Sequence, residues 1–114
     1  MTTSIQRTWT AICPAGAVPE HAGVAALLDG GVQVAIFRLP GDRFFALSNW
    51  DPCSGAAVLS RGIVGDADGV PVVASPVYKE RFALETGRCL DAPDVSVPVY
   101  EVRVREGVVE VESP

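Results

Sequence analysis

Long hydrophobic runs, a secretory leader and a disulfide framework are all missing from this sequence. No stretch approaches the roughly 18 consecutive apolar residues that a membrane-spanning helix requires. The first ten residues, MTTSIQRTWT, lack the apolar segment of a signal peptide. Three cysteines are too few, and odd in number, to hold a small fold together by disulfides. We therefore expect a cytoplasmic protein with reduced thiols.

Positive charge is also scarce. Nine basic residues face fourteen acidic ones, and the formal net charge is −5. This balance argues against nucleic-acid binding, which depends on a basic surface that displaces counterions from phosphates. Eight of the nine basic residues are arginines scattered along the chain. The planar guanidinium suits carboxylates and protein interfaces, although most of these arginines are expected to be ordinary surface charges.

What the sequence does contain is a sizeable apolar fraction arranged in short β-type segments. The 114 residues are 48% hydrophobic, enough for the core of one domain. Residues 31–40 and 43–49 predict two strands joined by a turn at 40–42. In the first strand both faces are apolar, with Val34 and Ile36 on one side and Ala35 and Phe37 on the other. We therefore expect that strand to be buried on both faces.

Further strands are expected over 69–75, where Pro71 favours an edge or a strand start, and over 80–87. Residues 97–112 predict a hairpin that turns at Glu106-Gly107. Residues 19–31 have some helical propensity, but glycines interrupt the segment and part of it is expected to be strand. Many short strands with Gly and Pro turns indicate an all-β fold, an antiparallel sandwich or barrel.

Two segments, 49–66 and 75–80, do not fit simple hairpins, and loops of this kind commonly carry function. In the first, Gly62 and Gly65 predict a turn. Two stretches that include parts of these segments, DPCSGAAVLSRG (51–62) and SPVYKERFALETGRCL (75–90), resemble the two cluster-binding loops of Rieske-type domains. Those loops read Cys-Pro-His-x-Gly-x-x-Leu and Cys-Pro-x-His-Gly-x-x-Phe-x-Leu-x-Thr-Gly-x-x-Leu. Six positions of the second pattern are in register: Pro76, Phe82, Leu84, Thr86, Gly87 and Leu90.

The resemblance implies a Rieske-like fold with a small loop-bearing subdomain at about 48–91, a base sheet from the rest, and a single domain over 1–114. Rieske domains hold a [2Fe–2S] cluster by two thiolates and two imidazoles. The four ligand positions here are Asp51, Cys53, Ser75 and Tyr78, and the sole histidine of the sequence is His21. The resemblance therefore implies a scaffold without its cluster.

Other roles for these four residues follow from their chemistry. A carboxylate, a thiol, a hydroxyl and a phenol form a poor metal-binding set, so no metal is expected. We expect Asp51 to accept backbone N–H bonds in its own loop and Tyr78 to fill the space that a cluster would occupy. Without a nearby base, Cys53 is expected to be a buried apolar thiol rather than a nucleophile, like Cys13 and Cys89.

Over about 6–112 the chain also resembles one cluster-less group, the small subunits of cytoplasmic NAD(P)H-dependent assimilatory nitrite reductases. This implies a non-catalytic accessory subunit without a cofactor of its own. Its partner would be the large subunit, which in that family carries FAD, a [4Fe–4S] cluster and sirohaem and reduces nitrite to ammonium. The choice between NADH and NADPH would be a property of the large subunit.

Two alternatives remain open at this point: a ferredoxin-type [2Fe–2S] electron carrier, and a free-standing β-domain with a regulatory or ligand-binding role. The residues near the two loops suggest where a partner would dock. Trp50 is a candidate aromatic anchor, with a core position as the alternative reading. Arg61, Lys79 and Arg81 are candidate interface charges, with plain solvated surface as the alternative.

Overall fold

The structure, a computed structural model, describes residues 8–28 and 30–112. In that part the chain forms strands β1 to β12 and two 3-10 helical turns, with no α-helix. The expected all-β fold is thus confirmed, and no described helix is long and apolar enough to cross a membrane. The N-terminal segment without a signal-like apolar run lies mostly outside the described residues, which begin at Thr8.

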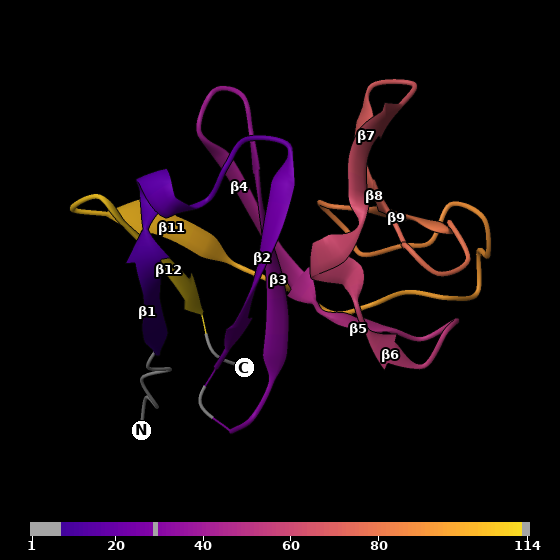
Figure 1. Cartoon of the computed structure of the whole chain (residues 1–114), viewed down its shortest axis with the longest axis horizontal. Coiled ribbons are helices and arrows are strands. Elements are labelled where there is room, and N and C mark those ends of the chain that lie inside the picture. Colours follow the sequence, from indigo (N-terminus) through magenta and orange to yellow (C-terminus); the bar gives the residue numbers. More distant parts are fainter. Residues whose placement is uncertain (1–7, 29, 113–114) are drawn as a thin grey trace, which may run out of the picture.

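A four-stranded antiparallel sheet occupies the middle of the molecule (Figure 1). Its order is β10 (Val99–Tyr100), β4 (Arg43–Ser48), β3 (Gln33–Leu39) and β2 (Ala22–Leu27). The predicted turn at 40–42 is confirmed, since Leu39 pairs with Arg43 on either side of it. The described residues of the region 19–31 contain strand β2 and no helix, because pairing along β3 outweighs the weak helical propensity of the segment.

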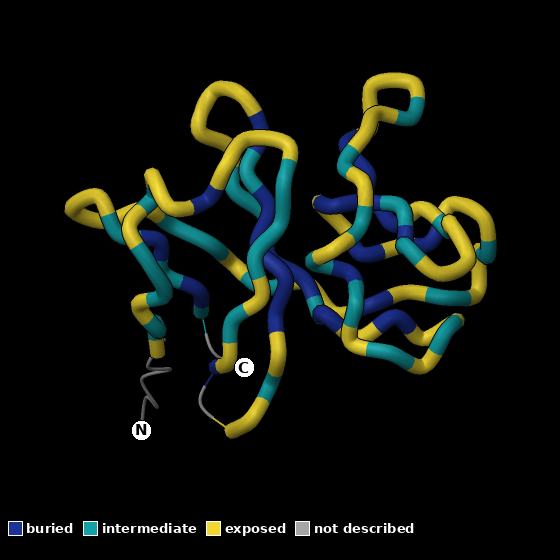
Figure 2. Tube along the Cα trace, viewed as in Figure 1, coloured by how far each residue is buried: buried dark blue, intermediate teal, exposed yellow. Residues whose placement is uncertain are grey.

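Strand β3 separates two hydrophobic cores, and Figure 2 shows its buried course through the molecule. Val34 and Ile36 pack into the core on the side of β12, and Ala35 and Phe37 pack into the core that includes Phe82. The alternation of two apolar faces predicted from the sequence is therefore confirmed. Because successive side chains of a strand point to opposite faces, this one strand couples both halves of the fold.

A second sheet, with order β1 (Trp9–Pro14), β12 (Val108–Glu112) and β11 (Val102–Arg105), covers one side of the central sheet. The predicted hairpin turns at Glu106 and Gly107, with φ values of 53° and 76°. Two consecutive positive φ angles match the twist of flanking strands in a tight hairpin. Val99 and Tyr100, which fall within the range predicted for this hairpin, pair with β4 instead.

The remaining elements form the loop-bearing part on the opposite side (Figure 1). These are β5 (Trp50–Asp51), β6 (Ala56–Ala57), the 3-10 turn η2 (Leu59–Arg61), β7 (Ile63–Ala67), β8 (Val70–Ala74) and β9 (Arg81–Ala83). The predicted turn at Gly62 and Gly65 is wrong, because Gly65 lies within β7 and pairs with Val72. Gly62 follows η2 and packs so tightly on the Ala74 carbonyl that a side chain would not fit.

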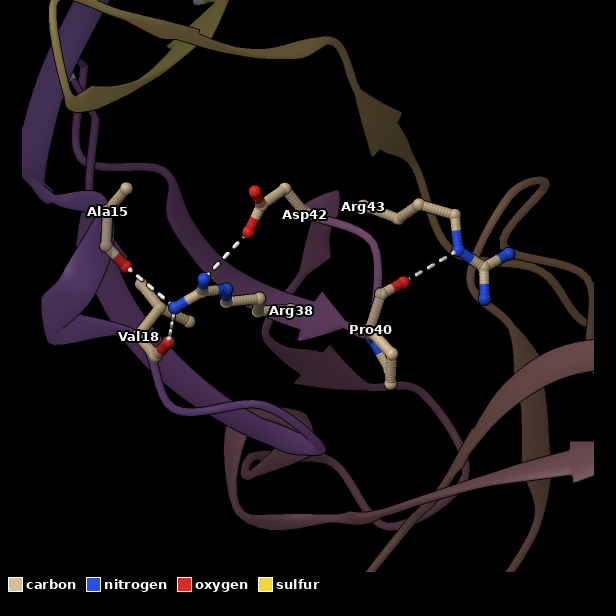
Figure 3. A network of polar contacts seen from close by, with 6 residues as sticks. All are labelled: Ala15, Val18, Arg38, Pro40, Asp42 and Arg43. Atoms are coloured by element: carbon tan, nitrogen blue, oxygen red, sulfur yellow. Dashed lines mark hydrogen bonds and ion pairs between the residues drawn. The ribbon is translucent and has the colours of Figure 1, made fainter.

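Arg38 of β3 fastens the 3-10 turn η1 (Ala15–Ala17) to the β3–β4 hairpin (Figure 3). Its Nη1 donates to the carbonyl oxygens of Ala15 and Val18 at 3.5 and 3.2 Å. Its Nη2 forms an ion pair with Asp42 at 2.7 Å in the turn. One guanidinium therefore satisfies carbonyl groups that no strand pairs and holds the connection between β1 and β2 in place.

Candidate functional site

Two loops meet at the end of the loop-bearing part, and each is closed by its own backbone hydrogen bonds. In the β5–β6 loop, the Gly55 N–H donates to the carbonyl of Asp51 at 2.8 Å. In the loop between β8 and β9, the Lys79 N–H donates to the carbonyl of Ser75 at 3.0 Å. Gly55 and Lys79 have φ values of 71° and 68°, the left-handed conformation that both tight turns require.

Asp51 is the centre of the first loop and is completely buried. Its Oδ1 accepts the backbone N–H groups of Cys53 at 2.9 Å and Ser54 at 3.4 Å. Its Oδ2 accepts the Ser54 hydroxyl at 2.9 Å and the Ser75 hydroxyl at 2.5 Å. The expectation that Asp51 accepts backbone N–H bonds of its own loop is confirmed.

The four donors also set the charge state of Asp51. Burial alone raises the pKa of a carboxyl group, because the charged form loses its hydration. Here the hydrogen bonds from Ser75, Ser54 and the backbone N–H of Cys53 outweigh burial and hold the pKa of Asp51 below its ordinary value of 3.8. Asp51 is therefore an ionised carboxylate, and hydrogen-bond donors of the protein take the place of the water that would hydrate it in solution.

Ser75 connects the second loop to the first. It is completely buried, and its hydroxyl donates across the 24 residues that separate it from Asp51 in sequence. The same hydroxyl oxygen accepts the Val77 N–H at 3.3 Å, and the Ser75 N–H donates to the Glu80 carbonyl at 2.9 Å. A serine–aspartate hydrogen bond therefore joins the two positions that the resemblance assigns to the thiolate ligands of a cluster.

Cys53 differs from its expected placement. It is exposed rather than buried, because its backbone turns around Asp51 at the outer end of the loop. The low reactivity of Cys53 stays a prediction, and it now has a different physical reason. The adjacent Glu80 carboxylate, partial desolvation and the charge of Asp51 raise the pKa of the Cys53 thiol to about 11, from an ordinary 9.0. The prediction of a buried thiol is confirmed for Cys89, whereas Cys13 is partly buried.

Tyr78 also differs from its expected placement. The side chain does not fill an internal space, since the residue is 65% exposed at the tip of the second loop. The reason lies in Asp51 and Ser75, whose direct hydrogen bond closes the two loops on each other. Val77 beside it is 46% exposed, so this tip presents apolar surface to solvent.

The residues present do not fit a [2Fe–2S] cluster. Two of the four ligand positions, Asp51 and Ser75, are buried and bonded to each other, and a third, Cys53, holds a neutral thiol. No imidazole is available from the loops, since the single histidine, His21, precedes β2. A mixed thiolate–imidazole centre needs both ligand types in their charged or basic forms.

Asp51, Cys53 and Glu80 do bring three potential ligand atoms within 4.8 Å of one another. Both oxygens of Asp51 already accept two donors each. A metal ion would have to displace those donors and also remove the proton from a thiol of high pKa. The arrangement suits a hydrogen-bonded junction between loops better than a metal centre, and the absence of a metal stays a prediction.

The candidate interface residues lie around this junction. Trp50 is 51% exposed, so it is not a core residue. Arg61 and Lys79 are exposed as well. The guanidinium of Arg81 forms two hydrogen bonds with Asp91, at 3.1 and 2.9 Å, and this contact lowers the pKa of Asp91 to about 2. Of the three charged candidates, Arg81 is the one whose charge is matched by an ion pair within the described part of the chain.

Sequence reasoning missed three contributors to the site. Ser54 follows Asp51 by three residues, a spacing that a search for Asp-centred turns would have detected. Glu80 and Asp91 carried no such local pattern. Their roles depend on how β9 and the segment after it fold back toward the loops, which spacing along the chain does not reveal.

Comparison with known proteins agrees with this description. A family model described as a Rieske-like [2Fe-2S] domain matches residues 8–112. The nitrite reductase (NADH) small subunit of Escherichia coli K12 is 45% identical over 104 residues, which cover 90% of this chain and 95% of that protein. The nitrite reductase [NAD(P)H] large subunit of Klebsiella oxytoca is 48% identical over 103 residues, 90% of this chain but 11% of that protein.

A solved structure described as an NADH-dependent nitrite reductase small subunit from Mycobacterium tuberculosis has a TM-score of 0.93 and 50% identity. The match covers 96% of this chain and 98% of that one. The similarity therefore includes the central sheet, the second sheet and the loop-bearing part. The chain belongs to the Rieske-like [2Fe-2S] domain family and, within it, to the nitrite reductase small subunits.

Proposed function

We propose that the chain is a non-catalytic accessory subunit of a cytoplasmic NAD(P)H-dependent nitrite reductase. The observation that carries this proposal is the end-to-end match to small subunits, 90% of this chain against 95% of the Escherichia coli protein. The agreement in fold with a solved small-subunit structure, over 96% of this chain, supports the same role. The loops themselves offer a neutral thiol and a buried carboxylate rather than a redox centre.

The proposed partner is the large subunit of that enzyme. In the Klebsiella oxytoca protein, a region similar to this chain forms 11% of a much longer polypeptide. A domain that is covalently joined to the large subunit in one organism is well suited to bind it as a separate chain in another. FAD, the [4Fe–4S] cluster, sirohaem and the reduction of nitrite to ammonium would then all belong to the large subunit.

We infer that docking involves the exposed surface around the paired loops, within a subdomain at 48–91 of a single domain. Trp50 supplies an exposed aromatic anchor, and Arg61 and Lys79 supply charges without an internal ion pair among the described residues. Tyr78 and the paired Arg81 extend the same surface. Exposed aromatic side chains of this kind dominate the energetics of many interfaces.

The test is reconstitution of nitrite reduction. Purified large subunit is assayed for nitrite-dependent NAD(P)H oxidation with and without this chain, and binding is measured on immobilised chain. We expect binding and a higher or more durable activity, and we expect Trp50→Ala to weaken binding about tenfold or more. Leu27→Ala, which removes a 64% exposed side chain from β2, is the matched control. No binding by the wild-type chain would refute the proposal and favour a free-standing β-domain.

A ferredoxin-type carrier is the competing function, because the matched family is named for a [2Fe-2S] domain. It is tested by iron and sulfide analysis and by visible absorption after anaerobic cluster reconstitution. We expect no stoichiometric iron and no charge-transfer bands, since the loops lack imidazoles. Iron and sulfide that stay bound through gel filtration would make this chain a redox protein.

A further inference from the structure

One cavity lies apart from the paired loops, between the central sheet, the second sheet and the segment that follows β9. Its volume is about 560 Å³, within the range of about 300–1,000 Å³ that is typical of ligand sites. Strand β4 contributes Phe44 and Phe45 to the lining. Glu101, which directly follows β10, also lines the cavity. None of the residues discussed at the paired loops lines this cavity.

The cavity exists because the chain changes sheets at this point. Strand β10 pairs with β4 only through Leu47 and Ala46, and after Tyr100 the chain departs to join β11 of the other sheet. Beyond Ala46, no described strand pairs with this edge of β4. Phe44 and Phe45 therefore lie on a part of β4 whose outer edge is unpaired, a place where an extended segment of another chain can add main-chain hydrogen bonds.

The charge of the lining is of one sign. Glu85, Glu101 and Glu112 line the cavity, and no Lys, Arg or His is among its described lining residues. Glu101 and Glu112 are adjacent, since the Glu112 N–H donates to the Glu101 carbonyl at 2.9 Å. Glu85 and Glu101 are exposed, and neither forms an ion pair within the described part of the chain.

Aromatic rings complete the lining. Phe44, Phe45 and Tyr100 are all partly buried at the cavity wall. Carboxylates beside aromatic faces match the guanidinium group, which donates two parallel hydrogen bonds to a carboxylate and stacks on rings. A lysine ammonium would satisfy the charge but would use the rings less fully.

We propose that this groove receives an extended, arginine-bearing segment of the nitrite reductase large subunit. The unpaired strand edge requires the bound segment to be extended. The carboxylates of Glu85 and Glu101 require it to be positively charged, and the aromatic rings favour arginine over lysine. The inference rests on the proposed function, because it takes the large subunit as the partner. It adds a second contact surface that is separate from the one around Trp50.

The test measures the dissociation constant of the complex between the full chain and purified large subunit. Glu85→Arg combined with Glu101→Arg is expected to weaken binding about 100-fold, since it replaces two charge-assisted contacts by repulsion. Glu20→Arg combined with Asp94→Arg changes the net charge equally at exposed positions outside the groove, and it is expected to change binding less than threefold.

The neutral pair Glu85→Gln and Glu101→Gln is measured alongside, so that a failure of the arginine variant to fold does not decide the outcome. Hydrogen exchange of the wild-type complex should show new protection of the Phe44 amide, which is on the same edge of β4 as the Ser48 amide that donates to Pro98. Wild-type affinity in both groove variants, with no protection at β4, would overturn the groove and leave the proposed function intact. No binding by wild-type chain would overturn both. Self-association that the groove variants abolish would assign the groove to a second copy and overturn the proposal.

Discussion

Replacing Asp51 by alanine tests whether the serine–aspartate junction holds the two loops together. The change leaves the buried Ser75 hydroxyl and the N–H groups of Cys53 and Ser54 without an acceptor. An unsatisfied buried donor costs about 1–3 kcal/mol. The N–H groups of Cys53 and Ser54 are only partly buried, so the cost for each lies at the lower end of this range. We therefore expect a loss of about 3 kcal/mol in the free energy of unfolding, or about 12 °C in melting temperature.

The assay is urea unfolding followed by far-UV circular dichroism, with a thermal scan as a second measurement. Ser75→Ala removes one donor and should cost less, about 1–2 kcal/mol. The double variant should cost less than the sum of the single changes, because both remove the same hydrogen bond. Asp94→Ala, at an exposed position, is the control and should stay within about 0.5 kcal/mol. A loss below about 1 kcal/mol for Asp51→Ala would refute the role assigned to this carboxylate.

The same carboxylate predicts an acid limit for stability. The pKa of Asp51 in the folded chain lies below its ordinary value of 3.8, so the unfolded chain binds the proton more readily. The stabilisation is therefore complete above about pH 4 and is lost as the pH falls through the folded pKa. Asp91, with a pKa of about 2, contributes in the same window. In Asp51→Asn, the loss of stability between about pH 4 and pH 2 should be smaller than in wild type, and an unchanged pH profile would contradict this.

Two further predictions concern Cys53 in the β5–β6 loop and Gly87 in the turn after β9. A pKa of about 11 leaves about 100-fold less thiolate on Cys53 at neutral pH than the ordinary value of 9.0 would. Alkylation by iodoacetamide, followed site by site in a mass spectrometer, should be slow and should accelerate about tenfold in Glu80→Gln. Gly87 and Gly41 both have positive φ, but only Gly87 has no room for a Cβ. Gly87→Ala should cost about 2–4 kcal/mol in urea unfolding and Gly41→Ala about 1, and equal costs would contradict the packing argument.

Much of the fold followed from local sequence patterns. The two apolar faces of β3, the turn at 40–42 and the turn at Glu106-Gly107 were all predictable, because each depends on residues that are close in sequence. The strand around Gly65 was not. Glycine favours turns when judged alone, but in β7 the pairing with β8 supplies the hydrogen bonds that make it a strand residue.

The sequence by itself determined that the loops lack the ligands of a [2Fe–2S] cluster, since this depends only on which residue types are present. The tertiary structure alone decided what replaces those ligands. Asp51 and Ser75 lie 24 residues apart and bond directly, and that bond leaves Tyr78 in solvent and Cys53 beside Glu80. Residue identity fixes which bonds are possible, but the distance between two loops is set by the packing of the strands that carry them.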